Sequence, residues 1–391
     1  MVRLGERQQA LDALLPVFYD LWHPQPFREN QPDWSLNLPA LADELLKLAD
    51  PDVACLNEDG AAALDLLARH VPAVAGIARL AHLPRRPGNA LVEQRASWAW
   101  EIPGRKRQQI EAFASASQCG AGSVIDWCGG KGHLGRLLAA QWQVPVHTLE
   151  IDAALCAEGA ALANRQRLSH EFLNINALTA ADWPKRGQHA VALHACGDLH
   201  RRLIAQGVDV GVARFDVAPC CYYRGVASTY QALSGNLRTA LTRDDVRLAV
   251  TETVTASARL TVQRDKEMAW KLGFDAYRRA SSGRQYQNFK PVPAVWFRGS
   301  FNEFLVLMAD RQGLSLPSAA TSGEFEAAGW RRHGEVMRLS IVRHAFRRAL
   351  EVWLALDLAV FLENRGYAVE LGSFCERQLT PRNLLISARL G

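Results

Sequence analysis

The stretch SVIDWCGGKGHLG, residues 123–135, decides the fold of this chain of 391 residues. Its first six residues form a short apolar run of strand length, and a glycine-rich turn follows at once. Residues 136–140, rich in leucine and alanine, continue as a predicted helix. Glycines between a strand and a helix let a ligand approach the backbone near the helix N-terminus. The stretch therefore predicts a ligand-binding strand–turn–helix unit.

Further strands are expected downstream of this unit. Short runs of strand length occur at residues 146–150, 170–174, 190–194 and 215–218, and helical or loop segments separate them. Strands that alternate with helices predict a parallel sheet with helices on both of its faces. Such sheets bind ligands beyond the carboxyl ends of their strands. We therefore expect functional residues directly after these strands.

The C-terminal part of the sequence specifies the fold further. A long amphipathic helix is expected over residues 340–365, Gly366 ends it, and two strands follow at residues 367–374 and 383–388. A hairpin that closes an otherwise parallel sheet is typical of the methyltransferase variant of the Rossmann fold. We predict an α/β fold with a Rossmann-like class I methyltransferase core, a mostly parallel seven-stranded sheet with a C-terminal antiparallel hairpin.

The sequence divides into three predicted parts. Leucines recur at helical spacing within residues 1–118, which we expect to form an N-terminal helical domain. The predicted cofactor-binding core comprises residues 119–221 and 336–391. Residues 222–335 are too long to serve as a simple connection, so we expect an inserted basic cap there.

Composition and charge narrow the class of protein. Hydrophobic residues make up 49% of the chain and charged residues 22%, which fits a folded protein and excludes a disordered one. The net charge is only +5, but the surplus lies after residue 221. Residues 222–335 hold 16 basic and 11 acidic side chains, and residues 336–391 hold 8 and 5. This distribution favours an anionic partner.

The compartment is predicted from what the sequence lacks. The first residues hold no uninterrupted apolar core of a signal peptide, and no apolar run reaches 18 residues. Eight cysteines at irregular spacing in a long chain are not a disulfide framework. We expect a cytoplasmic protein with reduced thiols, no membrane partner and no obligate protein partner.

The turn and the next strand together predict the cofactor. Glu150 ends the second strand, where a carboxylate can accept hydrogen bonds from the two hydroxyls of a ribose. Both NAD(P) and S-adenosylmethionine contain such a ribose. Asp126 stands at the head of the turn, as S-adenosylmethionine sites require. The sequence therefore favours S-adenosylmethionine.

Four motifs occur in a fixed order: DWCGGKG at residues 126–132, LHACGDL at 193–199, PCCY at 219–222 and TPRN at 380–383. In this the chain resembles the methyltransferase-like family that contains the "ribosomal RNA adenine dimethylase domain-containing" proteins and their bacterial relatives. It is more distantly similar to the glutathione S-transferase C-terminal-domain-containing proteins and to a eukaryotic tRNA 2′-O-methyltransferase. The resemblance covers roughly residues 100–225 and 340–391.

The resemblance implies a set of residues that contact S-adenosylmethionine. They lie in the turn and at the ends of the second, third and fourth strands: Asp126, Cys128, Gly130, Gly132, Glu150, Asn176, Ala177 and His194. Cys128 departs from the class I pattern, in which most members have glycine. Asn176 and Ala177 have an alternative interpretation as a plain strand-to-helix cap.

A second group of side chains follows the fourth and fifth strands and is expected to converge beside the transferred methyl group: His194, Cys196, Asp198, Cys220, Cys221 and Tyr222. Three interpretations stay open. A structural or substrate-positioning role ranks first and a cysteine nucleophile second. A metal site ranks last, because two of the cysteines are adjacent whereas structural zinc sites space their cysteines by two to four residues, and we expect no metal. Candidate catalytic bases are His194 and Asp198, while Tyr222 and Tyr223 are candidates to orient an acceptor.

The predicted cap interleaves basic and aromatic side chains. They are Arg259, Arg264, Lys266, Lys271, Arg278, Arg279, Arg284 and Lys290, with Trp270, Phe274, Tyr277, Tyr286 and Phe289 between them. This pattern suits phosphate contact and base stacking, and an amphipathic helix with its aromatic side chains in a core is the alternative. We therefore expect an S-adenosylmethionine-dependent methyltransferase with RNA, either tRNA or rRNA, as the favoured acceptor. The alternatives are a protein or small-molecule methyltransferase and a non-catalytic binding module.

Overall fold

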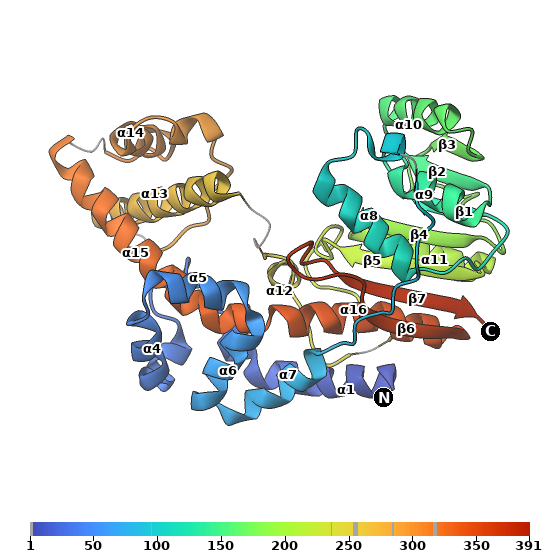
Figure 1. The fold of residues 1–391 in the computed structure, drawn as a ribbon. Helices are drawn as coiled ribbons and strands as arrows, with labels where there is room; N and C mark the ends of the chain where they lie inside the picture. Colours follow the sequence, from blue (N-terminus) through green and yellow to red (C-terminus); the bar gives the residue numbers. More distant parts are fainter. Residues whose placement is uncertain (1–2, 95, 236, 253–256, 284, 316–318) are drawn as a thin grey trace. The chain divides into compact units, whose positions relative to one another are not determined.

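The computed structural model describes residues 3–391 with the exception of residues 95, 236, 253–256, 284 and 316–318. Its centre is a seven-stranded sheet in the order β3-β2-β1-β4-β5-β7-β6 (Figure 1). Strands β1 to β5 are parallel, and β7 pairs antiparallel with both β5 and β6. The predicted class I methyltransferase sheet with its closing hairpin is therefore confirmed.

The strands agree closely with the predicted ranges. Their bounds are β1 Val124–Trp127, β2 Val146–Glu150, β3 His170–Asn174, β4 His189–Cys196, β5 Arg214–Cys220, β6 Tyr367–Ser373 and β7 Leu384–Leu390. Both β4 and β5 run two residues further than predicted, and the register pairs Cys196 with Cys220 at their carboxyl ends. The longer strands therefore bring two thiols onto neighbouring positions of one sheet edge.

Helices cover the sheet in the first of two compact units, which comprises residues 1–16, 77–255 and 347–391. These helices are α1 Leu4–Leu14, α8 Gly104–Ala116, α9 His133–Trp142, α10 Ala153–Arg165, α11 Asp198–Val210, α12 Arg243–Leu248 and α16 Arg347–Glu363. Phe113 of α8 and Leu137 of α9 pack into one apolar cluster with Val124 and Val146 of the sheet. Burial of this cluster fixes α9 directly behind the glycine-rich turn.

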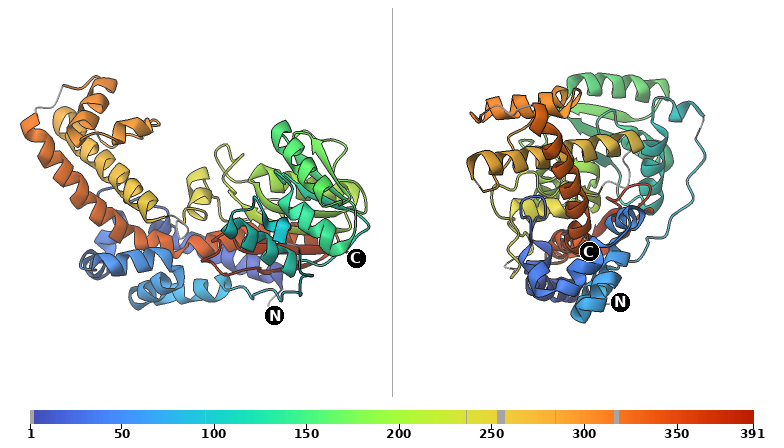
Figure 2. Two further views of the ribbon diagram at one scale, coloured as in Figure 1. Left: turned by 45° about the horizontal axis from the view of Figure 1, so that its top comes forward. Right: turned by 90° about the vertical axis from the view of Figure 1, so that its left-hand side faces the viewer.

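The second unit comprises residues 17–76 and 256–346 and is helical. Its elements are α2 Tyr19–Trp22, α3 Asp33–Asn37, α4 Pro39–Leu46, α5 Asp50–Glu58, α6 Gly60–His70, α13 Ala258–Ser282, α14 Phe301–Arg311 and α15 Ala319–Ala345, while α7 Ala75–Ala81 crosses the boundary. Single 3-10 turns cover Leu15–Phe18, Pro72–Val74, Ala96–Ala99 and Ala294–Phe297. Helices α13 and α15 pack against each other (Figure 2).

This division differs from the predicted three parts. Helix α1 belongs to the sheet unit because the carboxylate of Asp12, 5% exposed, accepts hydrogen bonds from the backbone of Arg238 and Thr239 and from the indole of Trp353. Residues 222–255 belong to the same unit. The predicted boundaries follow changes in local pattern, whereas the observed division follows long-range contacts of this kind.

The long helix expected over residues 340–365 is two helices. Helix α15 ends at Ala345, Phe346 is fully buried in a turn, and α16 starts at Arg347. The apolar periodicity continues across the break and no glycine or proline marks it, so the sequence pattern could not reveal it.

Among the described residues, no helix is both long enough and apolar enough to cross a bilayer.

Candidate methyl-transfer site

The glycine-rich turn between β1 and α9 is built from left-handed backbone. Cys128, Gly130 and Gly132 have φ values of 60°, 62° and 61°. A side chain at Gly130 would meet no described atom within 4 Å, whereas one at Gly132 would meet the Phe172 ring at 2.6 Å. Gly130 thus leaves open space above the turn, and Gly132 allows β3 to pack close beneath it.

Cys128 adopts this conformation although it carries a side chain, which is a strained arrangement. Burial raises the pKa of its thiol to about 12, with further contributions from the charges of Glu150 and Asp126. The thiol therefore stays protonated at neutral pH and is no candidate nucleophile.

The buried side chain of Asp126 stabilises the turn. Its carboxylate is 1% exposed and accepts hydrogen bonds from the backbone N–H of Gly135 at 3.1 Å and from the Thr148 hydroxyl at 3.4 Å. Burial raises the pKa of this carboxyl to about 6, although both hydrogen bonds act in the opposite direction. The carboxylate lies inside the fold and holds the turn through these hydrogen bonds, and its contact with a cofactor stays a prediction.

Glu150 stands at the end of β2 beside the turn, as the sequence predicts. One carboxylate oxygen accepts from the Gly130 N–H and the other from the Asp152 N–H, each at 3.0 Å. Ile151 and Leu178 lie 65% and 46% exposed at this end of the sheet. Exposed apolar side chains beside a polar anchor suit a planar base, and the only sequence signal for them is an isoleucine directly after the acid.

Asn176 and Ala177 take the positions expected of a cap. The Asn176 side-chain oxygen accepts from the Leu178 N–H at 3.0 Å, and Ala177 is buried. Asn174 donates to the carbonyls of Glu150 at 3.1 Å and Ile151 at 2.8 Å. A contact of Asn176 with the cofactor stays a prediction.

His194 lies on β4 with a left-handed backbone, φ 71°, at the irregularity between Leu193 and Cys196. Its Nε2 lies 2.9 Å from the side-chain oxygen of Gln109 on α8. The surrounding protein displaces water from the ring and lowers the pKa of His194, and the nearby positive charge of Lys106 lowers it further. The imidazole is therefore neutral at neutral pH and able to accept a proton.

Lys106 is a functional candidate that the sequence does not reveal. It is exposed on the first turn of α8, and its charge lowers the pKa of Asp126, His133 and His194. One ammonium thus influences groups at the turn, at the start of α9 and on β4. No motif marks this lysine, because it lies 20 residues before the turn in sequence.

Two tyrosines follow β5. Tyr222 is 0% exposed and packs edge-on against the ring of His200, 5.4 Å between centroids, and its role in orienting an acceptor stays a prediction. Tyr223 is half-buried, and the guanidinium of Arg247 lies 5.8 Å from its ring centroid. Tyr223, the residue after this motif, is therefore the more exposed of the two tyrosines. Asp198 is the first residue of α11 and is half-buried.

The aromatic residues of the predicted cap also differ from the expectation. Trp270, Phe274 and Tyr277 are buried in an apolar cluster of the helical unit. Arg278 is 1% exposed and pairs with Asp275. These four side chains are not available to RNA, and the amphipathic-helix alternative holds for them. Arg284 lies outside the described residues.

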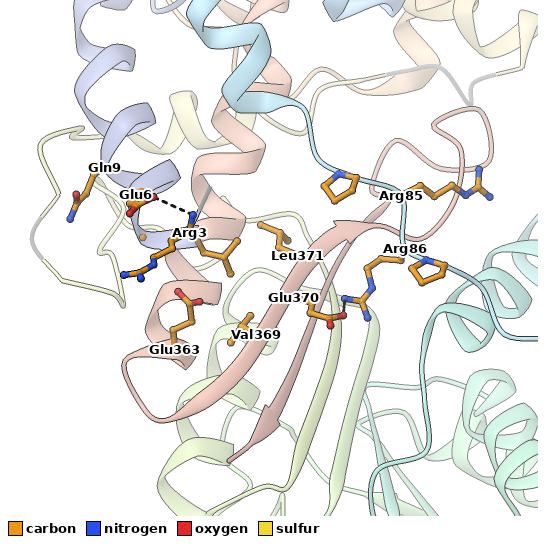
Figure 3. A pocket seen from close by; sticks show the side chains of 13 residues that line it. Arg3, Glu6, Gln9, Arg85, Arg86, Glu363, Val369, Glu370 and Leu371 are labelled. Atoms are coloured by element: carbon orange, nitrogen blue, oxygen red, sulfur yellow. Dashed lines mark hydrogen bonds and ion pairs between the residues drawn. The ribbon is translucent and has the colours of Figure 1, made fainter. Parts of the chain in front are cut away.

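One cavity of about 790 Å³ lies away from the turn. Figure 3 shows it between α1, the segment around Arg85 and Arg86, and strand β6. Its charged lining is balanced between arginines and glutamates, and Arg86 pairs with Glu370. It shares no residue with the turn or with the ends of β2, β4 and β5, so the cofactor residues define a separate site.

Comparison with known proteins agrees with this geometry. Residues 105–227 match a protein family described as a methyltransferase domain. The match spans strands β1 to β5 and does not reach β6 and β7. The match begins in α8 and ends after the PCCY motif, and so includes Lys106, the turn and the ends of β4 and β5. A methyltransferase domain on a sheet of this strand order uses S-adenosylmethionine as its cofactor.

No curated protein matches the chain. Among solved structures, the chain is similar to the Pyrococcus abyssi tRNA (uracil-54, C5)-methyltransferase in complex with S-adenosyl-L-homocysteine, at 16% identity over 29% of this chain and 27% of that one, with a TM-score of 0.24. It is also similar to the geranyl diphosphate C-methyltransferase of Streptomyces coelicolor, at 16% identity over 33% and 56% of the two chains, with a TM-score of 0.23. Matches with identities and TM-scores this low do not indicate which acceptor is methylated.

Proposed function

We propose that the chain transfers the methyl group of S-adenosylmethionine to RNA. The observation that supports RNA as the acceptor is a group of exposed cationic side chains near the carboxyl ends of β4 and β5. Lys106, Arg224 and Arg247 are exposed there, and Tyr223 lies beneath Arg247. Cations around an accessible aromatic ring suit an acceptor that carries both phosphates and bases.

The site residues have separate tasks in this reaction. When bound, the cofactor supplies an electrophilic methyl group on a sulfonium sulfur, and the acceptor displaces the sulfur. Glu150 and the Gly130 backbone hold the nucleoside end, while Asp126 keeps the turn in shape. His194 is neutral and accepts the proton that the acceptor loses when its nucleophile carries one. Alignment of acceptor and methyl group supplies the remaining acceleration.

The decisive experiment is transfer of a tritiated methyl group into total RNA and total protein from a strain that lacks this gene. We expect label in RNA and background label in protein. Label confined to protein would overturn the RNA acceptor and leave the methyltransferase intact. Absence of any calorimetric signal with S-adenosylmethionine or S-adenosylhomocysteine would overturn the cofactor assignment itself.

Lys106 offers a separate prediction for cofactor affinity. We expect its ammonium to pair with the carboxylate of S-adenosylmethionine. Because an exposed ion pair contributes about 1 kcal/mol or less, Lys106→Ala should raise the Kd about fivefold at low salt, with a smaller effect at high salt. Isothermal titration measures this change. Lys47→Ala, an exposed lysine of the helical unit, is the control, and an unchanged Kd for Lys106→Ala at low salt would contradict the pairing.

A further inference from the structure

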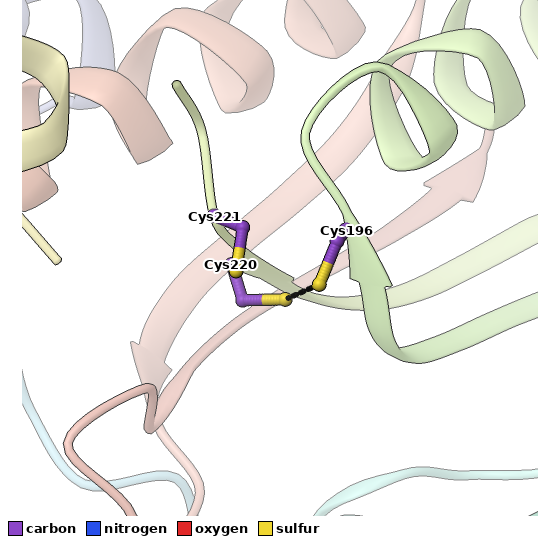
Figure 4. Close-up of side chains that lie close together, drawn as sticks. All are labelled: Cys196, Cys220 and Cys221. Atoms are coloured by element: carbon purple, nitrogen blue, oxygen red, sulfur yellow. Dashed lines mark hydrogen bonds between the residues drawn. The ribbon is translucent and has the colours of Figure 1, made fainter. Parts of the chain in front are cut away.

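Three thiols converge at the ends of β4 and β5. The sulfur atoms of Cys196, Cys220 and Cys221 all lie within 4.8 Å of one another, and those of Cys196 and Cys220 are 3.2 Å apart (Figure 4). We propose that these cysteines bind a thiophilic divalent cation, with zinc as the first candidate. This site is additional to the proposed methyl transfer and does not depend on the identity of the acceptor.

The backbone is specifically shaped to bring the sulfurs together. Adjacent residues of a strand point to opposite faces, so Cys220 and Cys221 would diverge if β5 continued. Cys221 instead follows the end of β5 with a left-handed φ of 46°, which an ordinary side chain rarely adopts. On β4, the irregularity before Cys196 places this residue opposite Cys220. Strained backbone at such a point commonly serves a functional site.

The geometry fits tetrahedral coordination. Zn–S bonds of about 2.3 Å place two sulfurs of a tetrahedron about 3.8 Å apart. The Cys196 and Cys220 sulfurs are 3.2 Å apart and the other sulfur pairs lie within 4.8 Å, so small rotations about the side-chain bonds suffice to reach this spacing. Cys220 is 3% exposed, whereas Cys196 and Cys221 are half-buried. One side of the trio thus stays accessible, and three protein ligands leave a fourth position open, as in catalytic zinc sites.

The charges around the trio suit an anionic metal–thiolate site. The positive charges of Arg224 and Arg382 act on Cys221. Three thiolates with one divalent cation carry a net charge of −1, which these arginines can offset. Arg224 is exposed, and its side chain hydrogen-bonds with that of Tyr223.

The adjacency of Cys220 and Cys221 does not exclude a shared metal in this fold. Adjacent cysteines diverge in regular strand backbone, whereas the backbone at Cys221 is left-handed. The left-handed residue after the strand is not visible in sequence, because cysteine does not favour that conformation.

The test measures metal content of the full-length protein. Protein purified without chelators, stripped of metal and then offered zinc, should hold one zinc per chain by mass spectrometry. Cadmium, as a spectroscopic probe, should produce the absorption band of cadmium thiolates. Cys196→Ser and Cys221→Ser should each weaken zinc binding at least tenfold. Cys119→Ser and Cys55→Ser, at exposed cysteines elsewhere, should bind as the wild type does, and circular dichroism confirms that each variant is folded.

Two results would overturn the site. One is that the wild-type protein takes up well under one zinc per chain. This result includes a Cys196–Cys220 disulfide, found by mass spectrometry, that persists when zinc and a reductant are added. The other is zinc binding that Cys196→Ser and Cys221→Ser leave unchanged. Methyl transfer is measured separately, so a protein that binds zinc and labels no RNA would support this site while contradicting the proposed acceptor.

Discussion

Glu150→Gln should weaken S-adenosylmethionine binding about 100-fold. We expect the carboxylate to accept hydrogen bonds from both ribose hydroxyls, and hydrogen bonds to a charged group contribute about 1.5–3 kcal/mol each. The amide keeps one oxygen for the Gly130 N–H, which now donates to Glu150 at 3.0 Å, but it loses the charge and one acceptor. A loss of about 2.7 kcal/mol corresponds to the expected factor. Isothermal titration of wild type and variant measures it.

Glu158→Gln is the matched control for this experiment. Glu158 pairs with Lys131 of the same turn, and its side chain is 53% exposed. Exposed ion pairs contribute little, so the control should change the Kd less than twofold. Because Glu150 caps local backbone groups, thermal unfolding of both variants is recorded without cofactor. Equal Kd values for wild type and Glu150→Gln would show that the ribose is held elsewhere.

The fold was predictable from local patterns that burial enforces. Strand β2 has the predicted bounds, because its apolar residues are buried in a sheet covered by helices. The edge strand β3 also has the predicted bounds, although none of its residues is fully buried. The glycine spacing alone does not separate cofactor types, since Gly130, Gly132 and Gly135 also fit the dinucleotide pattern G-x-G-x-x-G. The antiparallel hairpin of β6 and β7 makes the distinction, and it lies more than 200 residues downstream.

The sequence predicts which residues lie at the site better than it predicts the direction in which their side chains point. The sequence places Asp126 and Tyr222 at the correct edge of the sheet, but it does not show that both side chains turn inward. Orientation depends on packing against residues distant in sequence, such as His200 for Tyr222. Lys106 escapes prediction for a related reason, because only tertiary structure brings α8 to the turn. The three thiols converge because the backbone of Cys221 is left-handed, and no sequence pattern predicts this conformation.

Asp126→Asn should change the pH dependence of folding stability. The pKa of the buried carboxyl is about 6, against an ordinary value of 3.8, because burial disfavours its charged form. Between these values the folded protein binds the proton more tightly than the unfolded chain does. Stability from this group is therefore present below about pH 4 and is lost as pH rises to about 6. At neutral pH the cost is on the order of 3 kcal/mol.

The asparagine removes this titration and keeps an oxygen that can accept from the Gly135 N–H. The free energy of unfolding of Asp126→Asn relative to wild type should therefore rise by up to about 3 kcal/mol between pH 4 and pH 7, as measured by urea denaturation at several pH values. Asp65→Asn, at an exposed carboxyl of α6, should leave the wild-type profile unchanged. Parallel profiles for Asp126→Asn and wild type would show that the carboxyl is not protonated on folding.

Asp126→Ala should have a different effect, because it leaves the Gly135 N–H buried without its acceptor. The turn should then lose its shape and its affinity for the cofactor at every pH.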